Sequence, residues 1–360
     1  MVERVVLHVG TMKSGTSYLQ HVLGTGVLES VGGFYAGGCF KAQAKAVDRL
    51  PRWTDDRRPK VWHQLAQRVQ RRDGVAFLSH EFLSFAPEER VGRIIESFGG
   101  APVEVLLTVR DQRAAIPAQW QTYVRNRGTD SWDDYVRRLE TMRGGPRRRS
   151  QRVYAIRNFR RAQDVPTIIG RWRSHPGVTS LGVVLVPPAG SPPQLLWQRF
   201  CEAARIDAPE PPDGGTRQNP SLGYASCDVF RRLNPSLRDL SRVEHERARR
   251  VALQALLPLR AEEGRPELDQ QGAELARRLN RRIRRAVTAD GVRLVGSPDE
   301  LRVDDEVSGP DSIPPPDPAQ VQRALEAAWA GCVPGVAPPV GEADTVIAEL
   351  GRRLAARFGP

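Results

Sequence analysis

A short Gly/Ser/Thr-rich loop near the N-terminus constrains the fold of this chain more than any other stretch. Residues 5–9 form an apolar run of strand length, Gly10 ends the run, and a helical pattern of apolar side chains starts at Tyr18. The sequence therefore predicts a strand, an anion-binding loop and the N-terminus of a helix. In such a loop, backbone N–H groups and the helix dipole hold a phosphate or sulfate without a metal, and Lys13 adds a full positive charge.

The loop is close to the Walker A sequence GxxxxGK[ST] but differs from it at one place. Counted from Gly10, the two glycines of the motif have the correct spacing, yet Thr16 stands where the lysine belongs, and the lysine lies three places earlier. Residues 11–17, TMKSGTS, resemble the phosphosulfate-binding loop of sulfotransferases that use 3′-phosphoadenosine 5′-phosphosulfate (PAPS). The alternative is that a Gly-rich turn merely links a strand to a helix.

This resemblance implies a nucleotide site that needs no metal. The cofactor would be PAPS, which leaves as adenosine 3′,5′-bisphosphate once its sulfuryl group is transferred. The loop would hold the 5′-phosphate and stabilise the leaving oxygen. The residues to which the resemblance gives this role are Lys13, Ser14, Gly15, Thr16 and Ser17.

Two titratable residues, His80 and Glu81, follow directly on a second buried apolar run at residues 75–79. Ligands of an open parallel sheet bind beyond the carboxyl ends of its strands, so both residues would face the loop of Lys13, and either is a candidate general base. Alternatively, Glu81 caps or pairs with a helix and His80 is a satisfied core histidine. In glycan-modifying sulfotransferases a glutamate near the end of an early strand deprotonates the acceptor. Residues 79–83, SHEFL, resemble that arrangement, which favours Glu81 with His80 as the alternative.

A further strand is predicted at residues 103–109, and Arg110 follows it at once. The second nucleotide motif of sulfotransferases is similar: a strand, an arginine that grips the 3′-phosphate, and a serine eight places on. Arg110 matches the arginine, but Ala118 replaces the serine. A bidentate arginine contributes more to phosphate binding than one neutral hydroxyl, so the loss need not abolish binding. The alternative for Arg110 is an ion pair with Asp111 or a helix carboxylate.

A late loop at residues 216–222 contains Arg217 and Asn219. In the sulfotransferase fold, a late loop with a basic residue often closes over the nucleotide, and the resemblance implies this role for both residues. A plain helix start with Ser221 as its cap explains the same segment equally well.

Strands and helices alternate along most of the chain. Besides the strands above, the pattern predicts strands at 33–35 and 180–186, and helices at 60–72, 88–98, 114–125, 130–139, 165–172, 195–204, 224–233, 240–257 and 268–287. This order predicts an α/β fold with a central parallel sheet, and with the resemblance a P-loop-like three-layer fold. We expect one such domain at residues 1–300, a Pro-rich linker at 301–318 and a helical C-terminal tail at 319–360.

Composition narrows the class of protein. The chain has 360 residues, 40% of them apolar, which suffices for a full core, and it contains neither an uncharged apolar run of membrane length nor a signal sequence. We therefore expect a cytoplasmic protein without a membrane partner. The net charge of +12 alone would suit nucleic acid, but the positive charge is mostly arginine mixed with Asp and Glu, so no nucleic-acid partner is expected. Four scattered cysteines indicate neither a zinc site nor a disulfide framework.

Together these motifs resemble a PAPS-dependent sulfotransferase that transfers a sulfuryl group to a hydroxyl or amine of a small-molecule or carbohydrate acceptor. The acceptor pocket is expected in the loops at residues 24–54 and 129–157. Two other classes stay open. A P-loop kinase or NTPase would need Mg²⁺ and a Walker lysine, whereas a catalytically degenerate member of the fold would bind a nucleotide or another anion without turnover, as the missing hydroxyl at Ala118 suggests.

Overall fold

The computed structural model describes residues 1–54, 59–143, 153–211, 221–303, 306 and 309–359. The chain divides into two compact units. Unit 1 comprises Met1–Ala115, Phe159–Asn219 and Arg277–Asp305, and unit 2 comprises Ile116–Asn158, Pro220–Ala276 and Glu306–Pro360.

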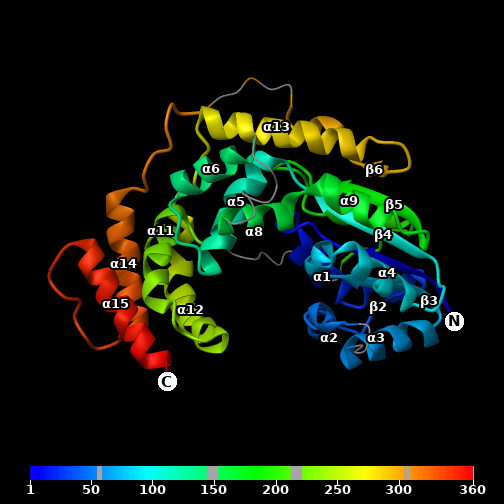
Figure 1. The fold of residues 1–360 in the computed structure, drawn as a ribbon, viewed down its shortest axis with the longest axis horizontal. Coiled ribbons are helices and arrows are strands. Elements are labelled where there is room, and N and C mark those ends of the chain that lie inside the picture. The colour runs from blue at the N-terminus through cyan, green and yellow to red at the C-terminus, as the bar shows by residue number, and fades with distance from the viewer. Residues whose placement is uncertain (55–58, 144–152, 212–220, 304–305, 307–308, 360) are drawn as a thin grey trace. The chain divides into compact units, whose positions relative to one another are not determined.

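Within its described residues, unit 1 is built on a six-stranded sheet in which every pair of neighbouring strands is parallel, in the order β2-β3-β1-β4-β5-β6 (Figure 1). The strands span Val2–His8 (β1), Gly33–Tyr35 (β2), Gly74–Ser79 (β3), Val103–Val109 (β4), Val178–Leu185 (β5) and Arg293–Val295 (β6). The predicted α/β fold with a central parallel sheet is thus confirmed. Because parallel strands share a carboxyl edge, the segments that follow β1, β3 and β4 are neighbours at that edge.

Alternate side chains of β1 face two separate apolar layers. Val5 and Leu7 belong to a core shared with α3 (Lys60–Arg71), α4 (Glu88–Glu96) and α9 (Val165–Arg173). Val6 belongs to the other core, shared with α1 (Thr16–Leu23) and α10 (Leu195–Ala204). Helices therefore cover both faces of the sheet (Figure 1), an arrangement consistent with a three-layer fold in which strands buried on both sides are mostly apolar.

Unit 2 is helical in its described residues. Its helices include α6 (Trp132–Glu140), α11 (Tyr224–Leu233), α12 (Arg242–Leu256), α14 (Pro318–Cys332) and α15 (Ala343–Phe358). Three further helices have residues in both units: α5 (Gln112–Arg125), α8 (Tyr154–Gln163) and α13 (Gln270–Val287). Helices α14 and α15 contact each other and both contact α11 and α12.

Three elements differ from the sequence prediction. Residues 24–54 were expected to be a loop, yet they contain α2 (Phe40–Val47). Within residues 129–157 the predicted helix at 130–139 is present as α6, but α8 also begins there and was not predicted. The third is β6, which pairs with β5 through Gly182 and Arg293 where the sequence predicts only the end of the compact part. A strand of three residues that begins with arginine carries too little alternation to be recognised, whereas α2 is hidden because it follows a Gly-rich stretch.

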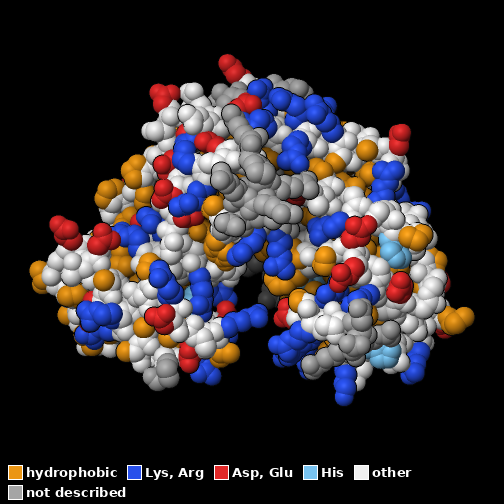
Figure 2. Space-filling view, viewed as in Figure 1, with side chains coloured by type: hydrophobic (Ala, Val, Ile, Leu, Met, Phe, Trp, Pro, Cys, Tyr) orange, Lys and Arg blue, Asp and Glu red, His pale blue; other side chains and the backbone are white. Residues whose placement is uncertain are grey.

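Charged side chains are interleaved over the surface. On the face shown in Figure 2, Lys and Arg lie over both units with Asp and Glu among them. Some of these charges are paired: buried Glu104 accepts from Arg4 at 2.8 Å, and Arg199 donates to Glu300 at 2.6 Å. The four cysteines are free thiols. Of the helices in the described residues, none is long and apolar enough to cross a membrane.

Candidate functional site

The loop after β1 is fixed to the neighbouring strand before it turns into α1. The backbone N–H of Thr11 donates to the Thr108 carbonyl at 2.8 Å, and the N–H of Thr108 donates to the Gly10 carbonyl at 2.6 Å. Lys13 (φ 62°) and Gly15 (φ 82°) are both left-handed, and Gly15 is the N-cap of α1 without a side-chain cap. Left-handed residues in a turn are typical of nests of backbone N–H groups that bind anions, and the helix N-terminus adds its partial positive charge.

Two glycines of the loop lie close against other segments of the protein. A Cβ on Gly10 would lie 3.1 Å from the Cα of Glu81, and a Cβ on Gly15 would lie 2.4 Å from Cδ2 of Leu196 on α10. Both glycines also have positive φ, which side chains rarely tolerate. The loop therefore touches the segment that follows β3, as the sequence predicts for strands that share a carboxyl edge.

A continuous row of buried polar side chains lies between the strand ends and the loop. Nδ1 of His8 on β1 is 2.7 Å from Oγ of Ser79 on β3, and its Nε2 is 3.1 Å from Oγ1 of Thr108 on β4. Thr108 Oγ1 is 2.6 Å from Oγ of Ser14 in the loop, and Ser14 Oγ donates to the Thr11 carbonyl at 2.5 Å. None of these five residues is more than 1% exposed. The Ser14 hydroxyl is thus bonded within the protein, so the side chain of Ser14 is not available to a ligand.

The direction of every hydrogen bond in this row follows from its last acceptor. A carbonyl only accepts, so Ser14 donates to Thr11 and must accept from the Thr108 hydroxyl. The Thr108 hydroxyl has one proton, which it donates to Ser14, so it accepts from the N–H at Nε2 of His8. Nδ1 of His8 accepts from the Ser79 hydroxyl. The row therefore fixes His8 as the neutral tautomer protonated at Nε2. Sequence reasoning missed this row, although a histidine inside an otherwise apolar strand is a signal that hydrogen-bond partners exist.

The pH dependence of stability should reveal this neutral imidazole. Burial lowers the pKa of His8 to about 3, against an ordinary value near 6.5. Between these values the unfolded chain binds a proton that the native chain does not, so the free energy of unfolding falls as the pH falls, by up to roughly 1.4 kcal/mol per pH unit. We expect His8→Gln to have a smaller slope between pH 6 and 4 in denaturant titrations. Equal slopes for both proteins would contradict a neutral His8.

Glu81 and His80 lie side by side but differ in the groups that they contact. The carboxylate of Glu81, at the start of a short 3-10 helix (Glu81–Phe85), accepts from Nε2 of Gln20 on α1 at 2.9 Å. His80 is 4% exposed, and its Nδ1 accepts from the N–H of Phe82 at 3.2 Å. Burial also lowers the pKa of His80, against an opposing effect of the Glu81 charge. A neutral ring whose Nδ1 accepts carries its proton on Nε2, so no unused lone pair is left, and the geometry favours Glu81 as the base.

Arg110 is half-buried directly after β4, at the same edge of the sheet. The neighbouring carboxylate of Asp111 accepts from the N–H of Arg113 at 2.7 Å, from Nδ2 of Asn280 at 2.9 Å and from the N–H of Arg302 at 3.0 Å. Asp111 thus fixes the backbone that follows Arg110. Ala118, which replaces the expected serine, lies on the part of α5 that belongs to unit 2. Arg217 and Asn219, predicted to close over the nucleotide, lie outside the described residues.

A second contact that the sequence does not reveal holds the loop from α8. Nε2 of Gln163 donates to the Met12 carbonyl at 2.7 Å, and Oε1 of Gln163 accepts from Nε2 of Gln112 at 3.4 Å. Gln163 thereby links the loop after β1 to the segment after β4. Gln163 and Met12 are 151 positions apart in the chain, so no local sequence pattern predicts their contact.

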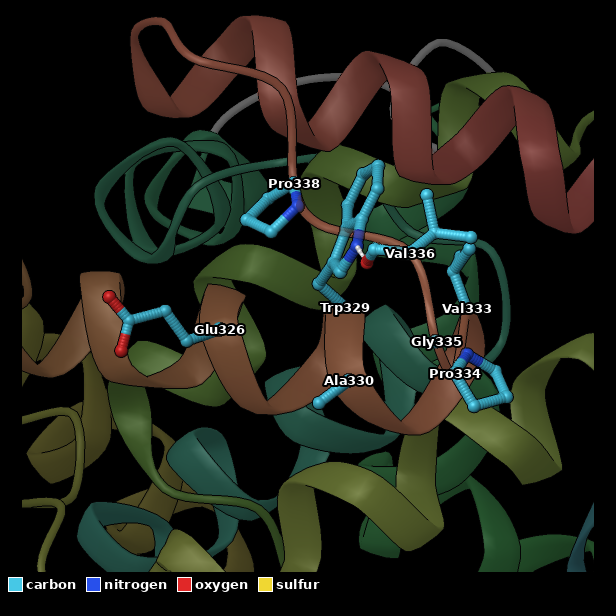
Figure 3. A pocket seen from close by; sticks show the side chains of 8 residues that line it. All are labelled: Glu326, Trp329, Ala330, Val333, Pro334, Gly335, Val336 and Pro338. Carbon is cyan, nitrogen blue, oxygen red and sulfur yellow. Dashed lines mark hydrogen bonds between the residues drawn. The ribbon is translucent and has the colours of Figure 1, made fainter.

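The described residues also line hollows away from this edge of the sheet. One of about 440 Å³ lies in unit 2 between α14 and the segment after it (Figure 3), with Trp329, Val333 and Pro338 around it and Glu326 as its one charged residue. The Trp329 indole donates to the Val336 carbonyl at 2.7 Å. No group of three or more His, Cys, Asp or Glu residues suited to a metal occurs within the described ranges.

Comparison of the chain with models of known protein families, with curated proteins and with solved structures finds no match. What the carboxyl edge of this sheet binds must therefore be inferred from its own side chains and backbone.

Proposed function

We propose that this chain is a PAPS-dependent sulfotransferase of P-loop-like fold, which transfers a sulfuryl group to a hydroxyl or amine of an acceptor. The observation that carries the proposal is the direct contact between the anion-binding loop and the carboxylate-bearing segment after β3. A Cβ on Gly10 would lie 3.1 Å from the Glu81 Cα, and Gln20 on α1 donates to the Glu81 carboxylate at 2.9 Å. An anion site beside a carboxylate suits the transfer of an anionic group to a nucleophile that must lose a proton.

Each residue at this edge has a separate role in the proposed reaction. PAPS as donor substrate supplies the activated sulfuryl group. Glu81 takes the acceptor proton while the acceptor oxygen or nitrogen forms its bond to sulfur and the bond from sulfur to the phosphate oxygen breaks. Lys13 and the backbone N–H groups of the loop stabilise the negative charge left on that oxygen, and Arg110 binds the 3′-phosphate. The products are the sulfated acceptor and adenosine 3′,5′-bisphosphate.

Two observations bear on the alternatives to this proposal, a kinase or NTPase and a degenerate nucleotide-binding protein. Thr16, at the position of the Walker lysine, is only 5% exposed at the start of α1, which disfavours a kinase or NTPase. Ala118 in place of the serine favours a degenerate nucleotide-binding protein. Release of the bisphosphate from PAPS in the presence of an acceptor distinguishes the enzyme from such a binder.

Thermal denaturation in EDTA tests the choice of nucleotide. We expect adenosine 3′,5′-bisphosphate to raise the melting temperature without Mg²⁺, and ATP to raise it less.

Arg110→Ala should weaken bisphosphate binding by about 1.5–3 kcal/mol, the usual size of a charge-assisted hydrogen bond, while a matched change at exposed Arg68 on α3 should have no effect.

Binding of adenosine 5′-phosphate, which lacks the 3′-phosphate, to the wild type and to Arg110→Ala shows whether Arg110 acts on that group. An equal loss of affinity for both nucleotides would mean that Arg110 is structural. Equal, Mg²⁺-dependent stabilisation by ATP would favour the kinase instead.

A further inference from the structure

Beside Glu81, four rings form a continuous row that we call the aromatic row: Phe40, His80, Phe82 and Phe85. The Phe40 ring is stacked on His80 with centroids 5.3 Å apart and an interplanar angle of 14°. His80 and Phe82 are 5.0 Å apart, and Phe82 is stacked on Phe85 at 5.2 Å and 20°. At the far end, the Arg161 guanidinium lies 4.1 Å from the centroid of Phe85.

The row is unusual because two of its phenylalanines, Phe40 and Phe82, are open to solvent. Phe40 is 39% exposed and Phe82 is 40% exposed, whereas nearly all large apolar side chains of unit 1 are in the cores. Phe40 begins α2, which follows β2, and Phe82 follows β3. Since β2 and β3 are adjacent parallel strands, both rings lie at the carboxyl edge of the sheet, on the side of the β1 loop opposite to β4 and Arg110.

This strand order separates the side of the edge proposed for the nucleotide from the side open to the acceptor. The loop after β1 and Arg110 after β4 would hold the nucleotide, so the acceptor must reach the sulfuryl group from the side of β3 and β2. That side presents Glu81 and the aromatic row. We infer that the acceptor is a phenol, whose ring packs on Phe40 and Phe82 while its hydroxyl faces Glu81. The inference rests on the function proposed above.

The hydrogen bonds of the segment after β3 favour a phenol over a sugar. Ser84 Oγ donates to the Glu81 carbonyl at 2.6 Å, and Arg171 donates to the carbonyls of Ser84 and Ala86 at 2.9 and 2.6 Å. These polar groups are thus satisfied within the protein. A sugar would bring several hydroxyls that need partners when buried, whereas a phenol brings one, the hydroxyl that reacts.

The pKa of the acceptor hydroxyl also favours a phenol over a sugar. A phenolic hydroxyl has a pKa of about 10, which is much closer to the pKa of a carboxylic acid than the pKa of an alcohol is. Proton transfer to Glu81 is therefore less uphill for a phenol than for a sugar hydroxyl.

Binding of 2-naphthol to the full chain tests the inference without requiring turnover. In calorimetric titrations with adenosine 3′,5′-bisphosphate at saturation, we expect 2-naphthol to bind and N-acetylglucosamine not to bind. Phe40→Leu and Phe82→Leu, which keep an apolar side chain but remove the ring, should each weaken 2-naphthol binding by about 3–10-fold, as expected for loss of one aromatic contact. Phe82→Tyr should retain the affinity, and Phe358→Leu, a matched change at the end of α15, should not alter it.

The outcomes separate this inference from the proposed function. Failure of the bisphosphate to bind overturns the proposed function, and the inferred acceptor with it. Normal bisphosphate binding with a 2-naphthol affinity that neither Phe→Leu change affects overturns the inference alone, as does preferential binding of the sugar.

Discussion

Replacement of Glu81 by glutamine is expected to lower turnover by about 10²–10⁴-fold, the range for loss of a positioned general base. The amide keeps the shape of the side chain, and its oxygen can still accept the hydrogen bond that Gln20 donates at 2.9 Å. What disappears is the basic oxygen that takes the acceptor proton. Adenosine 3′,5′-bisphosphate should therefore bind Glu81→Gln as it binds the wild type. The measurement is kcat at saturating PAPS with an acceptor that the wild type sulfates, together with the Kd of the bisphosphate.

His80→Asn is the matched comparison for this change. Asparagine can replace Nδ1 of His80 as the acceptor for the Phe82 N–H, because it is a favoured helix N-cap residue. We expect the variant to lose less turnover than Glu81→Gln. A larger loss would reverse the assignment of the base. If both variants keep near wild-type turnover, neither residue is the base, and the proton leaves through water or another group.

Much of the sheet could be predicted because its strands are buried on both faces. The runs at 103–109 and 75–79 are mostly apolar, and the structure places β4 and β3 there within one residue. Helix α10 was predicted with its observed bounds because its apolar residues recur at helical spacing. By contrast, β6 exists only through its pairing with β5, a long-range contact that leaves no local pattern.

The residues of the candidate site could likewise be predicted only in part from the sequence. Lys13, Glu81 and Arg110 could be proposed because each lies within four residues of the end of a predicted strand, and parallel topology brings strand ends together. The supports of the site could not be predicted, since they join distant segments: His8 with Thr108, and Gln163 with Met12. The choice between His80 and Glu81 also depends on three dimensions, because only the structure shows the Nδ1 of His80 accepting a backbone N–H.

Replacement of Lys13 by alanine should lower turnover by about 10²–10³-fold, the range for loss of one donor to a developing negative charge. Lys13 is half-buried and left-handed in the middle of the loop, on a backbone held by β4 and Gln163. Its ammonium group is the full charge nearest in sequence to the N-terminus of α1. If it stabilises the leaving oxygen, kcat at saturating PAPS should fall, because that charge appears only as the bond from sulfur to oxygen breaks.

The division of the loss between kcat and KM decides what Lys13 does. A rise in KM for PAPS with unchanged kcat would mean that Lys13 binds the donor equally in the ground state and the transition state. Lys60→Ala, an exposed lysine at the start of α3, is the matched control and should alter neither constant. A wild-type kcat for Lys13→Ala would leave the backbone N–H groups of the loop to stabilise the leaving oxygen. The left-handed loop, rather than its lysine, would then be the catalytic part of the motif.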